Sequence, residues 1–297
     1  MNGGTQRNKT EHLRKLHQES DVLVLPNAWD SLSARVFETC GFTAIATTSA
    51  GIAYTLGYPD GEMLGREEMA EATSRVAAAV KVPVTADIEA GYGTSPEDAA
   101  ETARAIIEAG AVGLNLEDAA DVAPPGSEGH LGDEPEASQV VDLQLQLEKI
   151  RAVVQAGEEA GVPIVVNART DLYWRSVDDP EWRFSEAVRR ANAFLEAGAE
   201  CVFVPGVKDP EIISALAREI AGPLNVLASP GISPIPELAS LGVRRVSVGS
   251  GPVRAVMGLV DSIGRELLEC GTYDNIGEKA IPYPEANALF MRRDSGM

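Results

Sequence analysis

Acidic residues end two neighbouring apolar segments of the 297-residue chain in a pattern that could hold a metal ion. Asp87 and Glu89 end one segment, and Glu117 ends the next. Because side chains alternate along a strand, Asp87 and Glu89 point to the same face, where Glu117 could join them. Carboxylate and water oxygens are the ligands that Mg²⁺ prefers, and Mn²⁺ is possible. The three residues predict a metal site, with strand-end capping or ion pairing as the simpler alternative.

A guanidinium and a run of small residues end two further apolar segments. Arg169 shares one face of its segment with Asn167 and Asp171, and its fork of donors fits carboxylate or phosphonate oxygens. The run Thr47-Thr-Ser-Ala-Gly51 offers backbone amides to a bound carboxylate. Pairing of Arg169 with a nearby acid is the alternative, and the two roles are compatible. We therefore predict a site for a small anion.

The elements that must position these residues alternate eight times between a short apolar segment and a longer amphipathic one. Strands that are apolar on both faces are typical of a parallel sheet covered by helices. A doubly wound sheet would favour a Gly-rich turn after the first strand, but that position reads Pro26-Asn-Ala-Trp-Asp30. The predicted strands are 22–28, 44–49, 82–89, 113–118, 164–170, 201–205, 224–228 and 245–249. The predicted helices are 31–40, 66–80, 96–109, 140–160, 185–197, 210–221, 235–241 and 253–269.

Eight such units in about 250 residues predict a (β/α)8 TIM barrel. We expect a single domain, with the barrel at about 20–271 and a C-terminal tail, 272–297, that contains one short helix at 283–292. Catalytic residues of such barrels lie at the carboxyl ends of the strands and on the loops that follow. Loops 50–65 and 119–139 are unusually long, and long loops are commonly functional, so both are expected to overlook one site.

The composition excludes several classes of partner. A net charge of −20 repels nucleic-acid phosphates and anionic membranes, so neither is expected to bind. The cysteines, Cys40, Cys201 and Cys270, form no disulfide pattern, which with the polar N-terminus predicts a cytoplasmic protein. Zinc is disfavoured because none of the three histidines stands beside a second soft ligand.

Several motifs occur in order along the chain. The most specific is Asp87-Ile-Glu-Ala-Gly-Tyr-Gly93. The others are Asn27-Ala-Trp-Asp30, Ser33-Ala-Arg35, Gly41-Phe42, Thr47-Thr-Ser-Ala-Gly51, Gly57-Tyr-Pro-Asp60, Asn115-Leu-Glu-Asp118, Asn167-Ala-Arg-Thr-Asp171 and Gly242-Val-Arg-Arg-Val-Ser-Val-Gly249. With them the chain resembles the isocitrate lyase/phosphoenolpyruvate mutase superfamily over nearly the whole barrel.

The resemblance implies roles for these residues. Asp87, Glu89 and Glu117 would hold Mg²⁺ directly or through water, with Asp60 as a catalytic residue beside them. Arg169 would bind a carboxylate or phosphoryl group and take part in catalysis. The residues implied to contact a 2-oxo or 2-hydroxy acid substrate are Trp29, Thr48, Ser49, Ala50, Asn167 and Arg169. The family further implies a homodimer or homotetramer in which the last helix and the tail are exchanged between subunits.

The loop after the fourth strand departs from the family pattern. Superfamily lyases carry Lys-(Lys/Arg)-Cys-Gly-His there, with the Cys as general acid, and mutases and phosphonopyruvate hydrolases carry a Lys with an Asn or Thr. Here, residues 119–137 contain neither Cys nor Lys. Of the reactive candidates Ser127, Glu128 and His130, we predict His130 as the acid, because its pKa suits proton transfer near neutrality. An exposed, idle histidine is the alternative.

Three functions remain open on this basis. The first is a Mg²⁺-dependent lyase or decarboxylase that breaks a carbon–carbon bond in a small 2-oxo or 2-hydroxy (di)carboxylate through an enolate. The second is a phosphoenolpyruvate mutase or phosphonopyruvate hydrolase, against which the missing loop Lys argues. The third is a catalytically quiet barrel that binds a 2-oxo acid.

Overall fold

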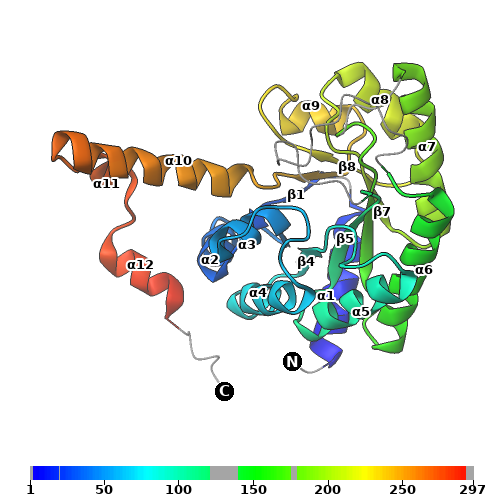
Figure 1. The fold of residues 1–297 in the computed structure, drawn as a ribbon, viewed down its shortest axis with the longest axis horizontal. Coiled ribbons are helices and arrows are strands. Elements are labelled where there is room, and N and C mark those ends of the chain that lie inside the picture. Colours follow the sequence, from blue (N-terminus) through cyan, green and yellow to red (C-terminus); the bar gives the residue numbers. More distant parts are fainter. Residues whose placement is uncertain (1–2, 20, 121–139, 175–178, 292–297) are drawn as a thin grey trace.

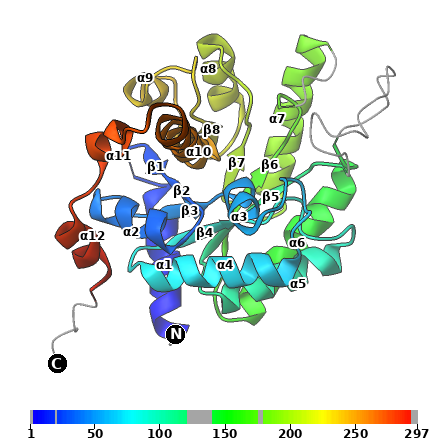
Figure 2. The same cartoon turned by 60° about the vertical axis from the view of Figure 1, so that its left-hand side comes forward.

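The computed structural model describes residues 3–19, 21–120, 140–174 and 179–291. Nine parallel strand segments form one sheet in the order β1-β9-β8-β7-β6-β5-β4-β3-β2. The two end segments, β1 (Leu23–Leu25) and β2 (Asn27–Ala28), are separated only by Pro26. The ends of the sheet are therefore consecutive in the chain, and the strands follow one another around a ring (Figure 2). This nearly closed, TIM-like parallel barrel confirms the predicted α/β class.

The remaining strands and the helices agree with most of the predicted ranges. The strands are β3 (Ile45–Thr47), β4 (Val84–Asp87), β5 (Gly113–Glu117), β6 (Val165–Arg169), β7 (Cys201–Phe203), β8 (Leu224–Leu227) and β9 (Arg245–Ser247). The helices are α1 (Gly3–Leu16), α2 (Ser31–Thr39), α3 (Ser49–Leu56), α4 (Arg66–Ala79), α5 (Pro96–Glu108), α6 (Leu143–Glu159), α7 (Pro180–Glu196), α8 (Pro210–Glu219), α9 (Ile235–Ser240), α10 (Gly251–Arg265), α11 (Asp274–Lys279) and α12 (Tyr283–Phe290), with a π-helical turn, η1 (Glu266–Cys270), after α10.

Two predictions about the elements of the barrel are wrong. The segment 50–65 is not a continuous loop, because its first half belongs to helix α3, which Thr48 caps by accepting a hydrogen bond from the Gly51 amide. Helix α7 begins five residues before the predicted start, where the Asp179 side chain caps it and Pro180 occupies its first turn. The small residues of α3 carry too weak a periodic signal to predict a helix.

The barrel closes through the side chain of Asn27. Its Nδ2 donates to the Thr47 carbonyl oxygen of β3 at 2.8 Å. Its Oδ1 accepts from the amides of Val248 and Gly249, just after β9, at 2.8 and 2.9 Å. Pro26 has no N–H to donate at this position. The buried Asn27 amide therefore joins the two sides of the seam where the strand ladder is interrupted.

Helix α1 covers the amino-terminal end of the barrel, and the sequence analysis assigned it no element. Gln6 Nε2 donates to the Ile107 and Ala111 carbonyl oxygens, and Arg14 pairs with Glu200 just before β7. His17 is buried at the end of α1 against Arg245, which is itself fully buried in the barrel. The opposite, carboxyl end of the strands is thus left for a functional site.

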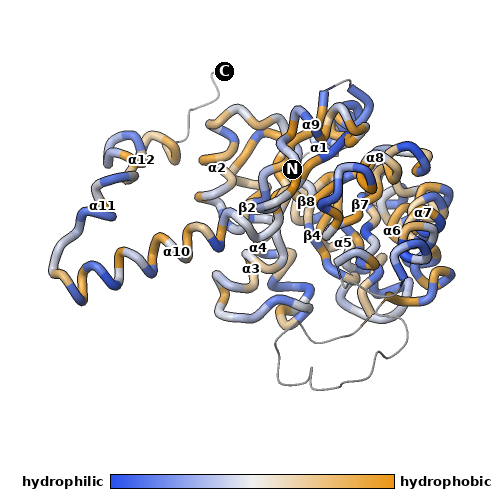
Figure 3. Tube along the Cα trace, turned by 90° about the horizontal axis from the view of Figure 1, so that it is seen from above, coloured by the Kyte–Doolittle hydropathy of each residue, from blue (hydrophilic) through white to orange (hydrophobic). Residues whose placement is uncertain are grey.

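The C-terminal part of the chain leaves the barrel. Helix α10 projects from it, and α12 returns to pack beside α2, where Arg35 Nε donates to the Leu289 carbonyl oxygen at 3.0 Å (Figure 1). Hydrophobic and hydrophilic residues alternate along α10 (Figure 3), and Val260 is 61% exposed there. The predicted helices at 253–269 and 283–292 are confirmed within a few residues. The prediction of one helix in the tail is wrong, because α11 precedes α12 there. In the described part of the chain, no helix has the length and apolarity to cross a membrane.

Candidate active site

Asp87 ends β4 and is tied to the first turn of α3. Its amide donates to Thr47 Oγ1 at 2.8 Å. Its carboxylate accepts from the Ser49 hydroxyl at 3.0 Å and from the Ser49 amide at 3.3 Å. These bonds direct the Asp87 carboxylate across the carboxyl ends of the strands, toward the amide-rich start of the helix.

Glu89 reaches the same rim through an unusual backbone conformation. Its φ is +50°, in the left-handed region that side chains larger than glycine rarely adopt. The buried carboxylate accepts from the Glu62 amide at 2.6 Å and from the Tyr92 hydroxyl at 3.2 Å. Burial, and then the carboxylates of Asp60 and Asp87, raise the pKa of Glu89 to about 8.

Glu117 and Arg169 lie opposite each other on the paired strands β5 and β6. Arg169 Nη1 lies 2.6 Å from a Glu117 oxygen, and its Nε and Nη2 lie 2.5 and 3.0 Å from the two oxygens of Asp171. The guanidinium carbon is 5.7 Å from the centre of the Phe203 ring. Burial raises the pKa of Glu117 well above its ordinary value, although Arg169 opposes the rise. The predicted alternative role of Arg169, pairing with nearby acids, is thus present.

Asp60 completes a group of four carboxylates. Burial, and then the charge of Asp87, raise the pKa of Asp60, whereas Arg169 lowers it. The same repulsion links Asp87 and Glu89 to Glu117. We call Asp60, Asp87, Glu89 and Glu117 the acidic rim. Desolvated carboxylates that disfavour one another's charge, with the Arg169 guanidinium 2.6 Å from one of them, form a site that an added cation would stabilise.

The acidic rim is not a direct ligand cage. Within the described ranges, no three His, Cys, Asp or Glu side chains are placed to bind one ion together. As the side chains stand, Asp87, Glu89 and Glu117 do not form a ready-made site, and their ligation of Mg²⁺, directly or through water, stays a prediction.

The predicted carboxylate cradle lies beside Asp87. Thr48, Ser49 and Ala50 are buried at the cap and first turn of α3. The amino end of a helix favours anions, because its first amides lack partners within the helix. The structure therefore brings this cradle and the acidic rim together.

Asn167 and Trp29 are the two remaining predicted substrate contacts. Asn167 is fully buried below Arg169, where its Nδ2 donates to Asn115 Oδ1 at 2.8 Å and its Oδ1 has no hydrogen-bond partner. Trp29 is half-buried and lines a hollow of about 400 Å³ between α2, α3 and α4. No carboxylate of the acidic rim lines this hollow. The predicted acid, His130, lies outside the described residues.

Comparisons with known proteins identify the family of the chain. A family model described as phosphoenolpyruvate phosphomutase matches residues 13–268. An uncharacterized protein of Mycobacterium tuberculosis is 34% identical over 277 residues, covering 92% of this chain and 93% of that protein. The chain belongs to the phosphoenolpyruvate mutase/isocitrate lyase superfamily. The resemblance predicted from the motifs is confirmed.

Both lyases and phosphorus–carbon enzymes of the superfamily are similar to the chain. A 2-methylisocitrate lyase of Aeropyrum pernix is 29% identical over 271 residues, covering 90% of this chain and 82% of that protein. A Burkholderia cenocepacia crystal structure, described as a candidate lyase/mutase, is 33% identical with a TM-score of 0.87 and covers 98% of each chain. A phosphonopyruvate hydrolase bound to oxalate and Mg²⁺ has a TM-score of 0.78 at 24% identity, covering 95% of this chain and 94% of that one, and shows the shared fold.

In this superfamily member, a buried ion pair lies behind the site and was missed by the sequence analysis. The Asp118 carboxylate accepts from the Asp171 amide at 2.9 Å and lies 3.1 Å from Arg190 Nη1 of α7. Arg190 also donates to the Val141 carbonyl oxygen at 2.9 Å, while Ala119 and Val140 form an antiparallel bridge. Burial raises the pKa of Asp118 to about 6, although Arg190 opposes the rise. The pair holds both ends of the segment 120–139 together, and only the acidity of Asp118 signalled it in the sequence.

Proposed function

We propose that the protein is a Mg²⁺-dependent lyase or decarboxylase that breaks a carbon–carbon bond in a small 2-oxo or 2-hydroxy (di)carboxylate through an enolate. The observation that carries the proposal is the acidic rim, which faces both Arg169 and the first turn of α3. One half of this arrangement is suited to a cation and the other half to a carboxylate. A substrate that is a carboxylate with an adjacent oxygen would contact both halves.

Mg²⁺ fits the acidic rim on electrostatic grounds. Burial and mutual repulsion raise the pKa values of Asp60, Glu89 and Glu117, so each of these groups would gain from a nearby cation. An oxygen-only donor set with water completing the shell suits Mg²⁺, and Mn²⁺ can replace it. Asp87, Glu89 and Glu117 would hold the ion directly or through water. When bound, the ion would stabilise negative charge that develops on the substrate.

The side chains around the rim would bind and orient the substrate. Arg169 would bind a substrate carboxylate, while Asp171 and Glu117 keep the guanidinium in place. At the start of α3, the Ala50 amide would bind a second anionic oxygen, because the Ser49 amide already donates to Asp87. Breakage of the carbon–carbon bond leaves its electron pair on one fragment as an enolate, which a proton then quenches. The other carbon leaves as carbon dioxide from a 2-oxo dicarboxylate, or becomes a carbonyl group in a 2-hydroxy substrate as the hydroxyl proton passes to solvent. We propose His130 as the donor of the proton that quenches the enolate, and it lies outside the described residues.

Chemistry at a phosphorus–carbon bond is the second candidate, because the matching family model is described as phosphoenolpyruvate phosphomutase. A lysine in the loop after β5 would support it. Residues 119–139 of this chain contain none, which argues against this candidate. The lyase loop motif is absent as well, but a decarboxylation needs no dedicated acid for a leaving aldehyde. A barrel that binds a 2-oxo acid without turnover is the third candidate.

In the test, the purified protein is incubated with Mg²⁺ and with one of three compounds: oxaloacetate, a methylisocitrate-type substrate or phosphonopyruvate. The release of pyruvate and of phosphate is then measured. Pyruvate without phosphate supports the lyase. Phosphate release or phosphonate rearrangement supports the second candidate, and thermal stabilisation by 2-oxo acids without turnover supports the third. Asp87→Asn should abolish the metal-dependent activity, whereas Glu159→Gln on the outer face of α6 should retain it. Full activity of Asp87→Asn would contradict the site.

We further propose that the protein is a homodimer or homotetramer in which α10 packs on a second copy. The support is the apolar face of α10, which is exposed because the helix projects from its own barrel (Figure 1). The exposed apolar residues of α10 are Val256, Met257, Leu259 and Val260. Exchange of this helix between subunits would bury that face.

A further inference from the structure

The segment that carries Glu89 has an unusual backbone. Glu89 and Tyr92 have φ values of +50° and +55°, and Gly91 and Gly93 have +106° and +156°. A Cβ on Gly93 would collide with the Asp98 side chain, so glycine is required there. Non-glycine residues persist in the left-handed region only when their surroundings hold them there. The question is which groups hold residues 89–93.

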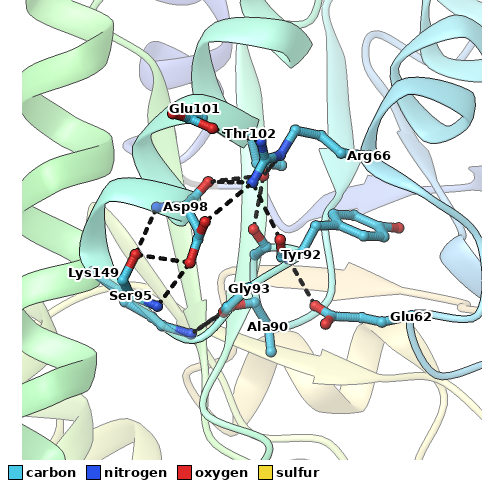
Figure 4. Close-up of polar contacts among 11 residues, drawn as sticks. Glu62, Arg66, Ala90, Tyr92, Gly93, Ser95, Asp98, Glu101, Thr102 and Lys149 are labelled. Carbon is cyan, nitrogen blue, oxygen red and sulfur yellow. Dashed lines mark hydrogen bonds and ion pairs between the residues drawn. The ribbon is translucent and has the colours of Figure 1, made fainter.

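Side chains from three helices donate hydrogen bonds to the backbone carbonyl oxygens of this segment (Figure 4). Lys149 Nζ of α6 donates to the Ala90 oxygen at 3.0 Å and to the Gly93 oxygen at 2.9 Å. Arg66 Nη2 of α4 donates to the Tyr92 oxygen at 3.2 Å. With a further hydrogen bond from Thr102 to the Gly91 oxygen, four consecutive carbonyl groups, from Ala90 to Gly93, have donors.

Thr102 of α5 donates the remaining hydrogen bond, and its hydroxyl also links Gly91 to Arg66. Its hydroxyl donates to the Gly91 oxygen at 2.7 Å and accepts from Arg66 Nε at 2.8 Å. Thr102 and Lys149 are buried, so water cannot readily substitute for them. These hydrogen bonds fix the orientation of every peptide between Ala90 and Gly93.

The segment from Ala90 to Gly93 is connected to the Glu89 carboxylate by hydrogen bonds. The Tyr92 amide donates to Glu62 Oε1 at 2.8 Å, and the Glu62 amide donates to Glu89 Oε2 at 2.6 Å. The Tyr92 hydroxyl reaches the other oxygen of Glu89 at 3.2 Å. A rotation of the peptides around Tyr92 would therefore move both groups that orient the Glu89 carboxylate.

We propose that Lys149, Arg66 and Thr102 are positioning residues that hold the left-handed backbone of Glu89, Gly91, Tyr92 and Gly93 and so place the Glu89 carboxylate on the acidic rim. They act through the backbone and do not touch the substrate. The inference rests on the proposed function in so far as the rim binds a divalent cation. The left-handed conformation itself can be measured without any cation.

The test combines three variants with two controls. Lys149→Met and Arg66→Met remove the cationic donors, and Thr102→Val removes one hydroxyl at nearly constant volume, which keeps a folded variant available. Arg151→Met and Arg75→Met remove exposed charges from the same helices, α6 and α4. Lys149→Arg, which keeps a donor, should restore part of any loss.

The first measurement is the affinity for Mn²⁺, read from the electron paramagnetic resonance of the free ion, which needs no turnover. We expect Mn²⁺ to bind about 10–100-fold more weakly to Lys149→Met and Arg66→Met, the usual effect of removing groups that orient metal ligands. Thr102→Val should lose a few-fold, and the two controls should bind like the wild type. Unchanged affinity in all three folded variants would overturn the inference.

The second measurement is hydrogen exchange of the peptide that spans residues 88–98, followed by mass spectrometry without metal. Faster exchange in the three variants but not in the controls supports the positioning role. If the wild type binds no Mn²⁺ while this exchange still rises, the proposed metal chemistry fails and the positioning role stands. If the exchange is unchanged, the positioning role fails whatever the metal result.

Discussion

Replacement of His17 by glutamine should change how the stability of the protein depends on pH. His17 Nδ1 lies 2.8 Å from the Leu13 carbonyl oxygen and therefore carries the proton, leaving Nε2 to accept from Arg245 Nη1 at 3.4 Å. A second proton would place an imidazolium against a buried guanidinium. Burial, and then the charge of Arg245, accordingly lower the pKa of His17 from 6.5 to about 4.

The size of the effect follows from linkage. Below pH 6.5 His17 is protonated in the unfolded chain but stays neutral in the folded chain. The free energy of unfolding therefore decreases as the pH falls. At pH 5.5, one unit below the unfolded value, the loss is about 1.4 kcal/mol, and it approaches roughly 3 kcal/mol near pH 4. Above pH 7 the two protonation states agree and the contribution vanishes.

The assay is urea unfolding of the wild type and His17→Gln at pH 7.5 and pH 5.5. A difference between proteins is needed because Glu89 and Asp118, whose pKa values are raised to about 8 and about 6, act in the opposite direction. Relative to the wild type, His17→Gln should gain about 1.4 kcal/mol on going to pH 5.5. The exposed His12→Gln is the matched control and should show no such gain. Parallel behaviour of wild type and His17→Gln would refute the reasoning.

Three further outcomes are expected. Arg190→Met leaves the Asp118 carboxylate buried without its ion-pair partner and should lower the free energy of unfolding in urea by about 3–5 kcal/mol; a loss below about 1 kcal/mol would contradict the buried pair. Mg²⁺ at about 100 times its dissociation constant should stabilise the wild type by about 2.7 kcal/mol in scanning calorimetry, and an equal gain in Asp87→Asn would argue against the rim. Val260→Glu on the exposed face of α10 should reduce the mass measured by light scattering to that of a monomer, and an unchanged mass would exclude this face as the interface.

The site was predictable where strand periodicity alone decides the geometry. Asp87 and Arg169 end predicted strands, and parallel strands place their carboxyl ends at the same side of the sheet. The ladder of β5 and β6 then sets Glu117 beside Arg169, a register that the sequence does not reveal. The ion pair that results was therefore only one of two open roles for Arg169.

Contacts between distant segments were not predictable. The motif 87–93 shows where the glycines of its segment lie. Lys149, which donates a hydrogen bond to the Ala90 oxygen, lies 59 residues away in the chain. Likewise, His17 precedes Arg245 by 228 residues. Helix and strand patterns indicate which face of an element is buried, but they do not indicate which segment covers that face.

The sequence by itself determined the alternation of strands and helices, the strand-end position of Asp87, Glu117 and Arg169, and membership of a superfamily. Local periodicity and short motifs suffice for these properties because each depends on neighbours within a few residues. Only the tertiary structure decided how the Glu89 carboxylate is oriented, since its left-handed backbone is held by side chains from α4, α5 and α6. Burial raises the pKa values of Asp60, Glu89 and Glu117 for the same reason: desolvation exists only once distant segments have packed around them.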